Sequence, residues 1–333
     1  MAVNRRRRWA VAALIGAVAV PGILQFGPVA VGPHLHARAP VFVVCCAVGS
    51  GPGAYDPTTG RFRPLAPGIS ADPLAVPVGC GSARGDTFTA PSPAAGRPGH
   101  TRLVRYSVSA TRPWTVVGSR VVRAVDVSGL TCSPDARFVG FVARRDGIRS
   151  AYVYDWQHAQ ILLTVPAASV GPICLACDDA GGLYVTTYRG RKRETSHIAR
   201  SGRTSLVPDA RLFATLRGRD AALFWTDGYW SCEIAVRPAR GRGATQTYRV
   251  SRFELAGSGV DIALNQALTV RSVLMSDDGE WIAAMVQATN TYGGCAVVLW
   301  KSGQPRPLTI SESTNLRHLW PIALLRKTLS APE

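Results

Sequence analysis

The strongest constraint on the fold of this chain is a series of short strands within residues 130–166. Three apolar, β-prone runs occupy residues 138–143, 150–154 and 161–165, and a polar loop with Asp146-Gly147 separates the first two. Strand-sized runs punctuated by Gly, Asp and Pro predict an antiparallel meander. A single meander cannot bury its own face, so we expect this one to be a copy of a repeated unit.

The same pattern of a large apolar residue, a polar turn and a short apolar strand recurs at spacings of 44 to 52 residues. The large residues of the six copies are Tyr55, Tyr106, Tyr154, Ile198, Tyr248 and Trp300. A period of roughly 40–50 residues with four strands per unit is typical of propeller blades. We therefore predict an all-β fold, a six-bladed β-propeller with four-stranded antiparallel blades.

A second alignment, on the turn between the first and second strands, agrees in three units, at residues 132–139, 177–184 and 275–282. Ser133-Pro134-Asp135 and Tyr152-Val153-Tyr154-Asp155 resemble the turn and strand of the TolB-type (WD-repeat-like) β-propeller repeat family. Ser276-Asp277-Asp278-Gly279 is a second instance of the turn, and Ala136 stands where the signature has Gly. The resemblance covers two or three of the six units. It implies the fold, and it makes a noncatalytic interaction module of the cell envelope an expectation.

The N-terminal residues have the features of a targeting signal. Arg5 to Arg8 precede an apolar run at residues 9–24, which predicts an export signal. The consecutive arginines also permit a twin-arginine signal. Cleavage sites are poor, and residues 9–32 are long enough to span a bilayer with the arginines in the cytoplasm. A cleaved signal peptide and a retained membrane anchor both stay open, so we expect an exported protein, either secreted or anchored outside the cytoplasm.

Three regions follow. Residues 1–37 are the signal peptide or N-terminal membrane anchor, residues 38–310 the propeller, and residues 311–333 a C-terminal tail. The apolar run at residues 39–44 fits a strand that closes the ring from the N-terminal side. The tail carries scattered large apolar residues, but Pro321 argues against a long helix. A closing strand and a surface-packed tail are the alternatives.

The formal net charge is +17, with a pI near 10.3, which favours contact with anionic matter. Only three of the 38 basic residues are lysines, so much of the charge also fits the composition of a GC-rich genome. Two predicted loops between second and third strands share one face of a propeller. They carry seven basic residues: Arg144, Arg145, Arg149, Arg189, Arg191, Lys192 and Arg193. These loops are either an anion-binding patch or a pair of solvated Arg-rich turns.

The chain has eight cysteines: Cys45, Cys46, Cys80, Cys132, Cys174, Cys177, Cys232 and Cys295. An even count in an exported chain predicts disulfides, and we expect at least two. Cys174-x-x-Cys177 also allows a redox motif. It lacks the helical setting of such motifs, and a zinc site would need a second pair at ligand spacing.

No nucleophile elbow, phosphate loop or metal-spaced histidine pair is recognisable, and turn formation already explains the acidic turns. We predict no cofactor and no metal. The first hypothesis is an exported, noncatalytic binding module of the bacterial cell envelope, monomeric, presenting its basic loop face to a protein or anionic partner. The alternative is an exported hydrolase or lyase with a site at the central channel, assembled from residues too scattered to leave a motif. Nucleic-acid binding is a third reading, opposed by export and by the lack of a base-stacking motif.

Overall fold

The computed structural model describes residues 41–326, except 48–50, 60, 65–79, 82–86, 109–112, 167–173, 190–191, 208–209, 241, 263–264, 277, 288–294 and 313–318. The chain is divided after residue 32, and the second of its two units spans residues 33–333. All described residues lie in the second unit. The predicted export segment therefore falls outside the described residues.

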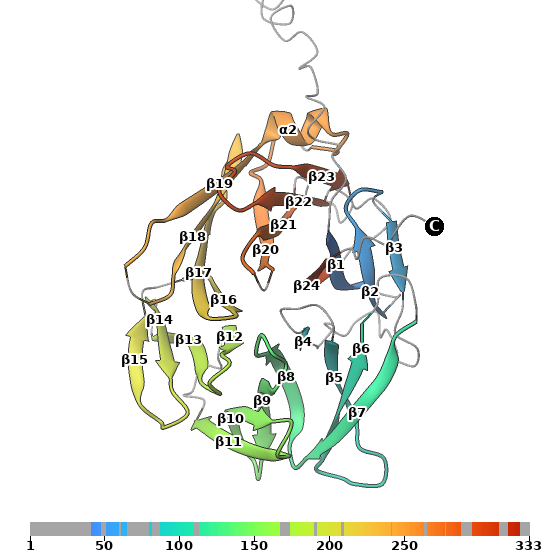
Figure 1. Cartoon of the computed structure of the whole chain (residues 1–333), viewed down its shortest axis with the longest axis vertical. Coiled ribbons are helices and arrows are strands. Elements are labelled where there is room, and N and C mark those ends of the chain that lie inside the picture. Colours follow the sequence, from blue (N-terminus) through green and yellow to red (C-terminus); the bar gives the residue numbers. More distant parts are fainter. Residues whose placement is uncertain are drawn as a thin grey trace, which may run out of the picture. The chain divides into compact units, whose positions relative to one another are not determined.

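Six four-stranded antiparallel sheets form the second unit (Figure 1). From the innermost strand outward, they consist of β24 (Leu319–Arg326), β1 (Val41–Ala47), β2 (Gly51–Asp56) and β3 (Arg61–Pro64); β4 (Cys80–Gly81), β5 (Thr87–Pro93), β6 (Thr101–Ser107) and β7 (Thr115–Val122); β8 (Val125–Cys132), β9 (Phe138–Arg145), β10 (Ile148–Asp155) and β11 (Gln160–Pro166); β12 (Cys174–Cys177), β13 (Leu183–Arg189), β14 (Lys192–Ile198) and β15 (Thr204–Val207); β16 (Leu212–Leu216), β17 (Arg219–Thr226), β18 (Ser231–Pro238) and β19 (Gln246–Ser251); and β20 (Thr269–Met275), β21 (Trp281–Gln287), β22 (Cys295–Lys301) and β23 (Thr309–Glu312). The predicted propeller with four-stranded antiparallel blades is confirmed.

The innermost strands close into a ring. Each of β4, β8, β12, β16, β20 and β24 contacts the innermost strand of the sheets on either side of it. One sheet is built from both ends of the chain, because β24 pairs with β1 from Val41↔Arg326 to Ala47↔Leu319. Pro321 sits in β24 beside a shift of register, where a proline is tolerated. Of the two arrangements considered for the tail, residues 319–326 form the closing strand.

The repeated turn between first and second strands has one backbone conformation in three sheets. Ala136, Gly181 and Gly279 have φ values of 60°, 77° and 70°, and the N–H of each donates to the carbonyl three residues earlier. This agrees with the second alignment. Ala136 occupies a left-handed conformation that favours glycine, which explains why the family signature has Gly there.

The first alignment holds in five units, whose large residues lie in third strands, and is wrong in one. Tyr248 lies in β19, the fourth strand of its sheet. The connection between β18 and β19 spans residues 239–245, and this long loop shifts the apparent period by one strand. The aromatic at the expected spacing therefore lies in a different strand from its counterparts in the other five units.

The core lies between neighbouring sheets, where apolar side chains from facing sheets interdigitate. One buried cluster joins sheet β16–β19 to sheet β20–β23 and includes Tyr248, Val273 and Trp300. Others join β4–β7 to β8–β11, β8–β11 to β12–β15, and β12–β15 to β16–β19. This packing fixes the two faces of the ring. We call the face with the first-to-second and third-to-fourth turns the turn face, and the face with the second-to-third loops and the links between sheets the connection face.

Candidate recognition surface

The basic loop between β9 and β10 is a tight two-residue hairpin on the connection face. Asp146 and Gly147 have φ values of 51° and 80°, the left-handed pair that such hairpins require. Arg144, Arg145 and Arg149 are exposed on either side of it. Because these side chains are solvated, their presence in an exposed turn does not require a ligand.

Two of these arginines have acidic partners. The guanidinium of Arg144 lies 3.7 Å from the carboxylate of Asp126, and that of Arg145 lies 3.7 Å from Asp146. Arg123 approaches Asp146 at 2.7 Å. Exposed pairs of this kind contribute about 0–1 kcal/mol each. They nevertheless neutralise part of the charge that the sequence assigned to this loop.

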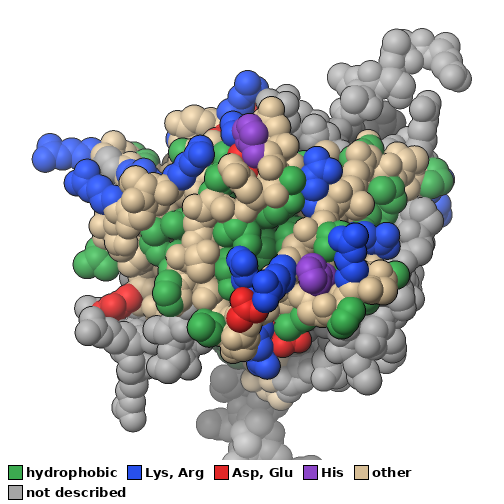
Figure 2. Space-filling model, turned by 90° about the horizontal axis from the view of Figure 1, so that it is seen from below, with side chains coloured by type: hydrophobic (Ala, Val, Ile, Leu, Met, Phe, Trp, Pro, Cys, Tyr) green, Lys and Arg blue, Asp and Glu red, His purple; other side chains and the backbone are tan. Residues whose placement is uncertain are grey.

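The second basic loop joins β13 to β14 on the same face, with Arg189 opposite Lys192 in the register. Arg191 and the side chains of Arg189, Lys192 and Arg193 lie outside the described residues. Figure 2, a view from below in Figure 1, shows Lys and Arg side chains in several separate groups. The predicted anion-binding patch thus stays a prediction.

An exposed aromatic cluster, which the sequence did not reveal, lies on the connection face of sheet β16–β19. Tyr229 and Trp230 come from the loop between β17 and β18, and Phe253 comes from helix α2 (Arg252–Gly257), which follows β19. These side chains are 44%, 60% and 46% exposed. Trp230 and Phe253 stack at 5.9 Å between ring centroids, and Tyr229 meets Trp230 edge-on at 5.0 Å. Three contiguous exposed rings of this size usually mark an interaction site.

Arg252 holds the aromatic cluster in place from beneath. Its side chain is 5% exposed, and its guanidinium lies 4.5 Å from the centre of the Tyr229 ring. Its Nε donates to the carbonyl of Tyr229 at 2.8 Å, and its Nη2 donates to the carbonyl of Gln266. The backbone N–H of Arg252 donates to the carbonyl of Trp230 at 2.8 Å. One buried side chain thus ties the loop, the helix and the following segment together.

The loop and the helix are also fixed by their own ends. Ser251 and Glu254 form a capping box at the start of α2. Asp227 accepts from the N–H of Val270 at 2.8 Å, and Gly228 forms a two-way backbone bridge with Leu268. The rings are therefore held by an ordered support, so that covering them would cost little further conformational entropy.

A buried hydrogen bond between a histidine and a carboxylate lies on the turn face, within sheet β12–β15. The Nε2 atom of His197 lies 2.7 Å from the carboxylate of Asp178, which also accepts from the N–H groups of Gly182 and Ala180 at 2.7 and 3.0 Å. Burial would raise the pKa of Asp178, but these hydrogen bonds outweigh it, so its pKa lies below the ordinary value. A Cβ at Gly182 would lie 2.7 Å from the Asp178 carboxylate, so only glycine leaves room for this pair.

The same pair belongs to a network that reaches the next sheet. The hydroxyl of Tyr184 donates to Asp220 at 2.5 Å and accepts from Nε of Arg240 at 3.1 Å, and Arg240 approaches Asp178 at 3.7 Å. Tyr184 also stacks on Phe213 at 4.8 Å. Burial and the neighbouring Asp220 raise the pKa of Tyr184, and burial raises that of Asp220. We call these residues (Asp178, Tyr184, His197, Asp220 and Arg240) the inter-sheet polar network, because they join sheet β12–β15 to sheet β16–β19.

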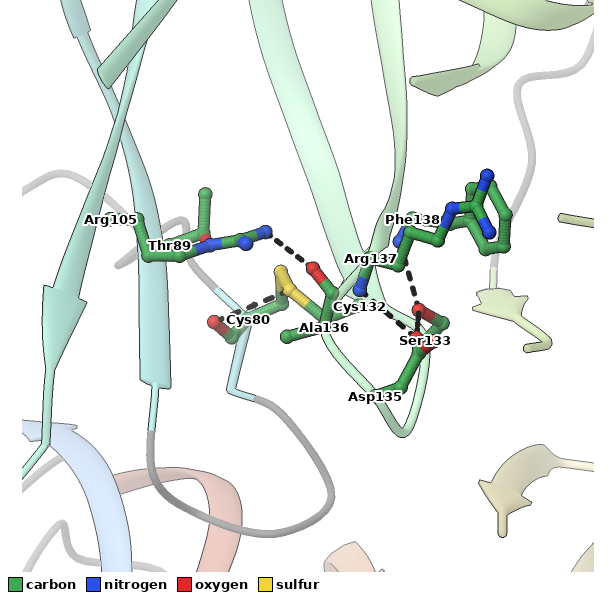
Figure 3. The surroundings of a disulfide bond; sticks show 9 residues. All are labelled: Cys80, Thr89, Arg105, Cys132, Ser133, Asp135, Ala136, Arg137 and Phe138. Carbon is green, nitrogen blue, oxygen red and sulfur yellow. Dashed lines mark hydrogen bonds between the residues drawn. A yellow bond between two sulfur atoms is a disulfide. The ribbon is translucent and has the colours of Figure 1, made fainter. Parts of the chain in front are cut away.

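A disulfide bond joins Cys80 to Cys132, also on the turn face, with the two Cα atoms 5.6 Å apart (Figure 3). The two residues lie on the innermost strands of adjacent sheets. Arg105 reaches across the same junction and donates to the carbonyl of Ala136 at 2.6 Å. Bridging requires Cα atoms within about 7 Å, which neighbouring innermost strands provide.

Three other predicted disulfide cysteines, Cys177, Cys232 and Cys295, are free and buried, which corrects the expectation for them. Cys232 and Cys295 occupy matching places on third strands, but the sheets diverge outward from the ring (Figure 1). Burial raises the pKa of Cys232 to about 12 and that of Cys177 well above its ordinary value. A thiol of this kind disfavours the redox reading of Cys174-x-x-Cys177. The side chains of Cys45, Cys46 and Cys174 lie outside the described residues.

Within the described ranges, no group of three or more His, Cys, Asp or Glu side chains is placed to hold a metal ion. Among the same residues, no helix is both long and apolar enough to cross a membrane.

Comparison with known proteins supplies the fold. No protein-family model matches the sequence, and no curated protein matches it. Among solved structures, TolB from Acinetobacter baumannii aligns over 86% of this chain and 66% of its own, with 12% identity and a TM-score of 0.53. This chain folds as a TolB-like β-propeller. A chain of the nidogen/laminin complex aligns over 85% of this chain and 98% of its own, with 11% identity and a TM-score of 0.50. This propeller spans less than two thirds of the TolB chain, and identities this low establish the fold alone.

Proposed function

We propose that this protein is an exported, noncatalytic binding module of the cell envelope that docks a protein partner on its connection face. The observation that carries the proposal is the aromatic cluster of Tyr229, Trp230 and Phe253. Full burial of a large apolar side chain contributes about 1.5–3 kcal/mol, and three rings that stay 44–60% exposed forgo part of that free energy. The support under the rings is nevertheless elaborate, with a buried arginine, a capping box and a backbone bridge. A surface built this way gains its burial when a partner covers it.

Export is supported by two independent features. The N-terminal arginines and the apolar run after them have the order of an export signal. The Cys80–Cys132 bridge fits an oxidising compartment, since stable disulfides are rare in the cytosol. The fold adds a scaffold whose loops serve recognition in many proteins, and the nidogen/laminin structure that shares it was solved as a complex.

A protein partner fits the connection face better than a purely anionic one. Aromatic residues are enriched at the centres of protein interfaces, where they supply large buried area at a small entropic cost. The arginines of the β9–β10 hairpin lie on the same face, where they would act at the rim and govern association rate and salt dependence.

The experiment compares three forms of the purified full chain for binding to solubilised envelope proteins, at low and high salt. We expect the double variant Trp230→Ala and Phe253→Ala to lose partner binding at both salt concentrations. We expect the triple variant Arg144→Gln, Arg145→Gln and Arg149→Gln to keep it at high salt. The opposite pattern, with binding lost only in the arginine variant, would refute the aromatic site and restore the anion-binding reading.

A further inference from the structure

A second candidate site is an open cleft of about 390 Å³ at the outer rim, between sheets β12–β15 and β16–β19. Ser205, Leu206 and Val207 of β15 line one wall, and the end of β18 with the loop after it lines the other. Successive side chains of a strand point to opposite faces of its sheet. Because three successive residues line this wall, we infer that the backbone edge of β15 borders the cleft.

β15 is the outermost strand of its sheet and pairs only with β14. An outer strand presents backbone N–H and C=O groups on its free edge, and an added strand can pair with them. Leu206, in the middle of this edge, is 79% exposed. The wall formed by β15 therefore has both the backbone groups and the apolar side chain that an extended peptide would use.

The opposite wall supplies two guanidinium groups. Arg237 lies over the ring of Phe224 at 4.1 Å, and its Nε is buried without a hydrogen-bond partner. None of the carboxylates in the described part of the chain forms an ion pair with Arg237. A partly buried cation without a counter-charge is destabilising, so an anion in the cleft would be bound favourably.

Arg240 lines the cleft beside it and has a side chain that is 53% exposed. Tyr184 and Asp178 hold one side of its guanidinium, at 3.1 and 3.7 Å. This anchoring fixes the group at the cleft and reduces the entropy lost when it binds a ligand. Planar guanidinium groups bind carboxylates through paired hydrogen bonds.

We propose that this cleft binds an extended acidic peptide, which adds as a strand to the edge of β15 and places a carboxylate on Arg237 and Arg240. The backbone edge favours an extended peptide, and the uncompensated charge of Arg237 favours a carboxylate. This site lies on different residues from the aromatic cluster, so its failure would leave the proposed function untouched.

The test uses fluorescence polarisation of the full chain with a labelled hexapeptide of alternating valine and glutamate. We expect binding that weakens at least about tenfold in Arg237→Gln and in the double variant with Arg240→Gln, because each change removes a partly buried charge contact. Arg200→Gln with Arg203→Gln, two exposed arginines of the neighbouring turn outside the cleft, is the matched control and should bind normally. Thermal melting identifies any variant that loses stability, and Arg237→Gln leaves the inter-sheet polar network intact.

Two further probes decide the mode of binding. Methylation of alternate backbone amides of the peptide should abolish binding if it pairs as a strand, and a peptide of valine and lysine should not bind. Equal binding of the methylated peptide, or of acetate at the same concentration, would reduce the cleft to a simple anion site and overturn the proposal. Unchanged affinity in Arg237→Gln would overturn it as well.

Discussion

The inter-sheet polar network on the turn face and the aromatic cluster on the connection face use hydrogen bonds in opposite ways. In the network, polar side chains such as Asp178, His197 and Tyr184 are themselves buried, and their bonds hold two sheets together. In the aromatic cluster, a buried arginine donates a hydrogen bond to the carbonyl of Tyr229 and packs against its ring. These contacts hold side chains that are themselves partly exposed. The fold fully accounts for the first arrangement. The proposed function accounts for the second by a partner that covers the rings, which are 44–60% exposed.

The disulfide on the turn face should have the largest effect on stability. Removing the Cys80–Cys132 bridge, by Cys80→Ala with Cys132→Ala, should lower the free energy of unfolding by about 4 kcal/mol, because the bridge closes a long loop. Urea unfolding followed by circular dichroism measures this change. Partner binding by the folded fraction should be unaltered. A large loss of binding at full folding would mean that the turn face takes part in recognition.

The aromatic cluster can be tested through its support. Arg252→Met should lower the free energy of unfolding by about 1–3 kcal/mol, because the carbonyls of Tyr229 and Gln266 lose their donor. It should also weaken partner binding, because the rings lose their fixed position. Arg249→Met is the control. The Arg249 side chain is exposed, and its long, exposed contact of 3.8 Å with Glu233 contributes little stability. Equal effects of the two variants would show that the buried arginine does not order the cluster.

A smaller effect concerns acid stability. The pKa of Asp178 is lowered in the folded state, so its contribution is present above the ordinary Asp pKa of about 3.9 and is lost as the pH falls through the folded value. The pKa of Asp220 is raised, so protonation of that group favours the folded state as the pH falls.

The two carboxyls should therefore shift acid unfolding in opposite directions. Asp178→Asn should flatten the loss of stability at low pH, whereas Asp220→Asn should steepen it. Urea unfolding at several pH values between 3 and 7 measures both slopes. Identical slopes in the two variants would contradict the assignment of opposite shifts within the inter-sheet polar network.

The smallest effect is expected at the repeated turn. Ala136→Gly should raise the free energy of unfolding by about 0.5–1 kcal/mol, because glycine adopts a positive φ without the steric penalty of a side chain. Gly181→Ala is the mirror variant at the matching position. It should destabilise, since its Cβ would also lie 3.3 Å from Phe138. Thermal unfolding of the pair measures both changes, and effects of the same sign would refute the structural equivalence of the two turns.

The sequence predicted the ring because its repeat is local. A polar turn ending near Ala136 or Gly279 and feeding an apolar strand is visible in a few consecutive residues. The repeat is misleading at Tyr248. This aromatic occurs at the expected spacing, but because of the long loop before β19 it lies in the fourth strand of its sheet. The repeat therefore predicts blades more reliably than it predicts individual strands.

The candidate sites were harder to predict because they join distant residues. Trp230 and Phe253 are 23 residues apart and meet only through the fold. Their single local signal was the Tyr229-Trp230 pair in a turn between two strands, where polar residues are usual. The cysteine pairing depended on which strands are innermost, and counting cysteines does not reveal that. The runs of arginine are visible in the sequence because they are contiguous, although exposed charged side chains are solvated and need no partner.

Photo-crosslinking in the intact envelope tests the central claim most directly. Benzoylphenylalanine placed at Phe253 should give one discrete adduct with a partner protein, and Trp230→Ala in the same chain should abolish it. The same probe at Arg200, on the turn face, is the control and should not give that adduct. An adduct of equal yield from both positions, or one that survives Trp230→Ala, would contradict recognition through the aromatic cluster.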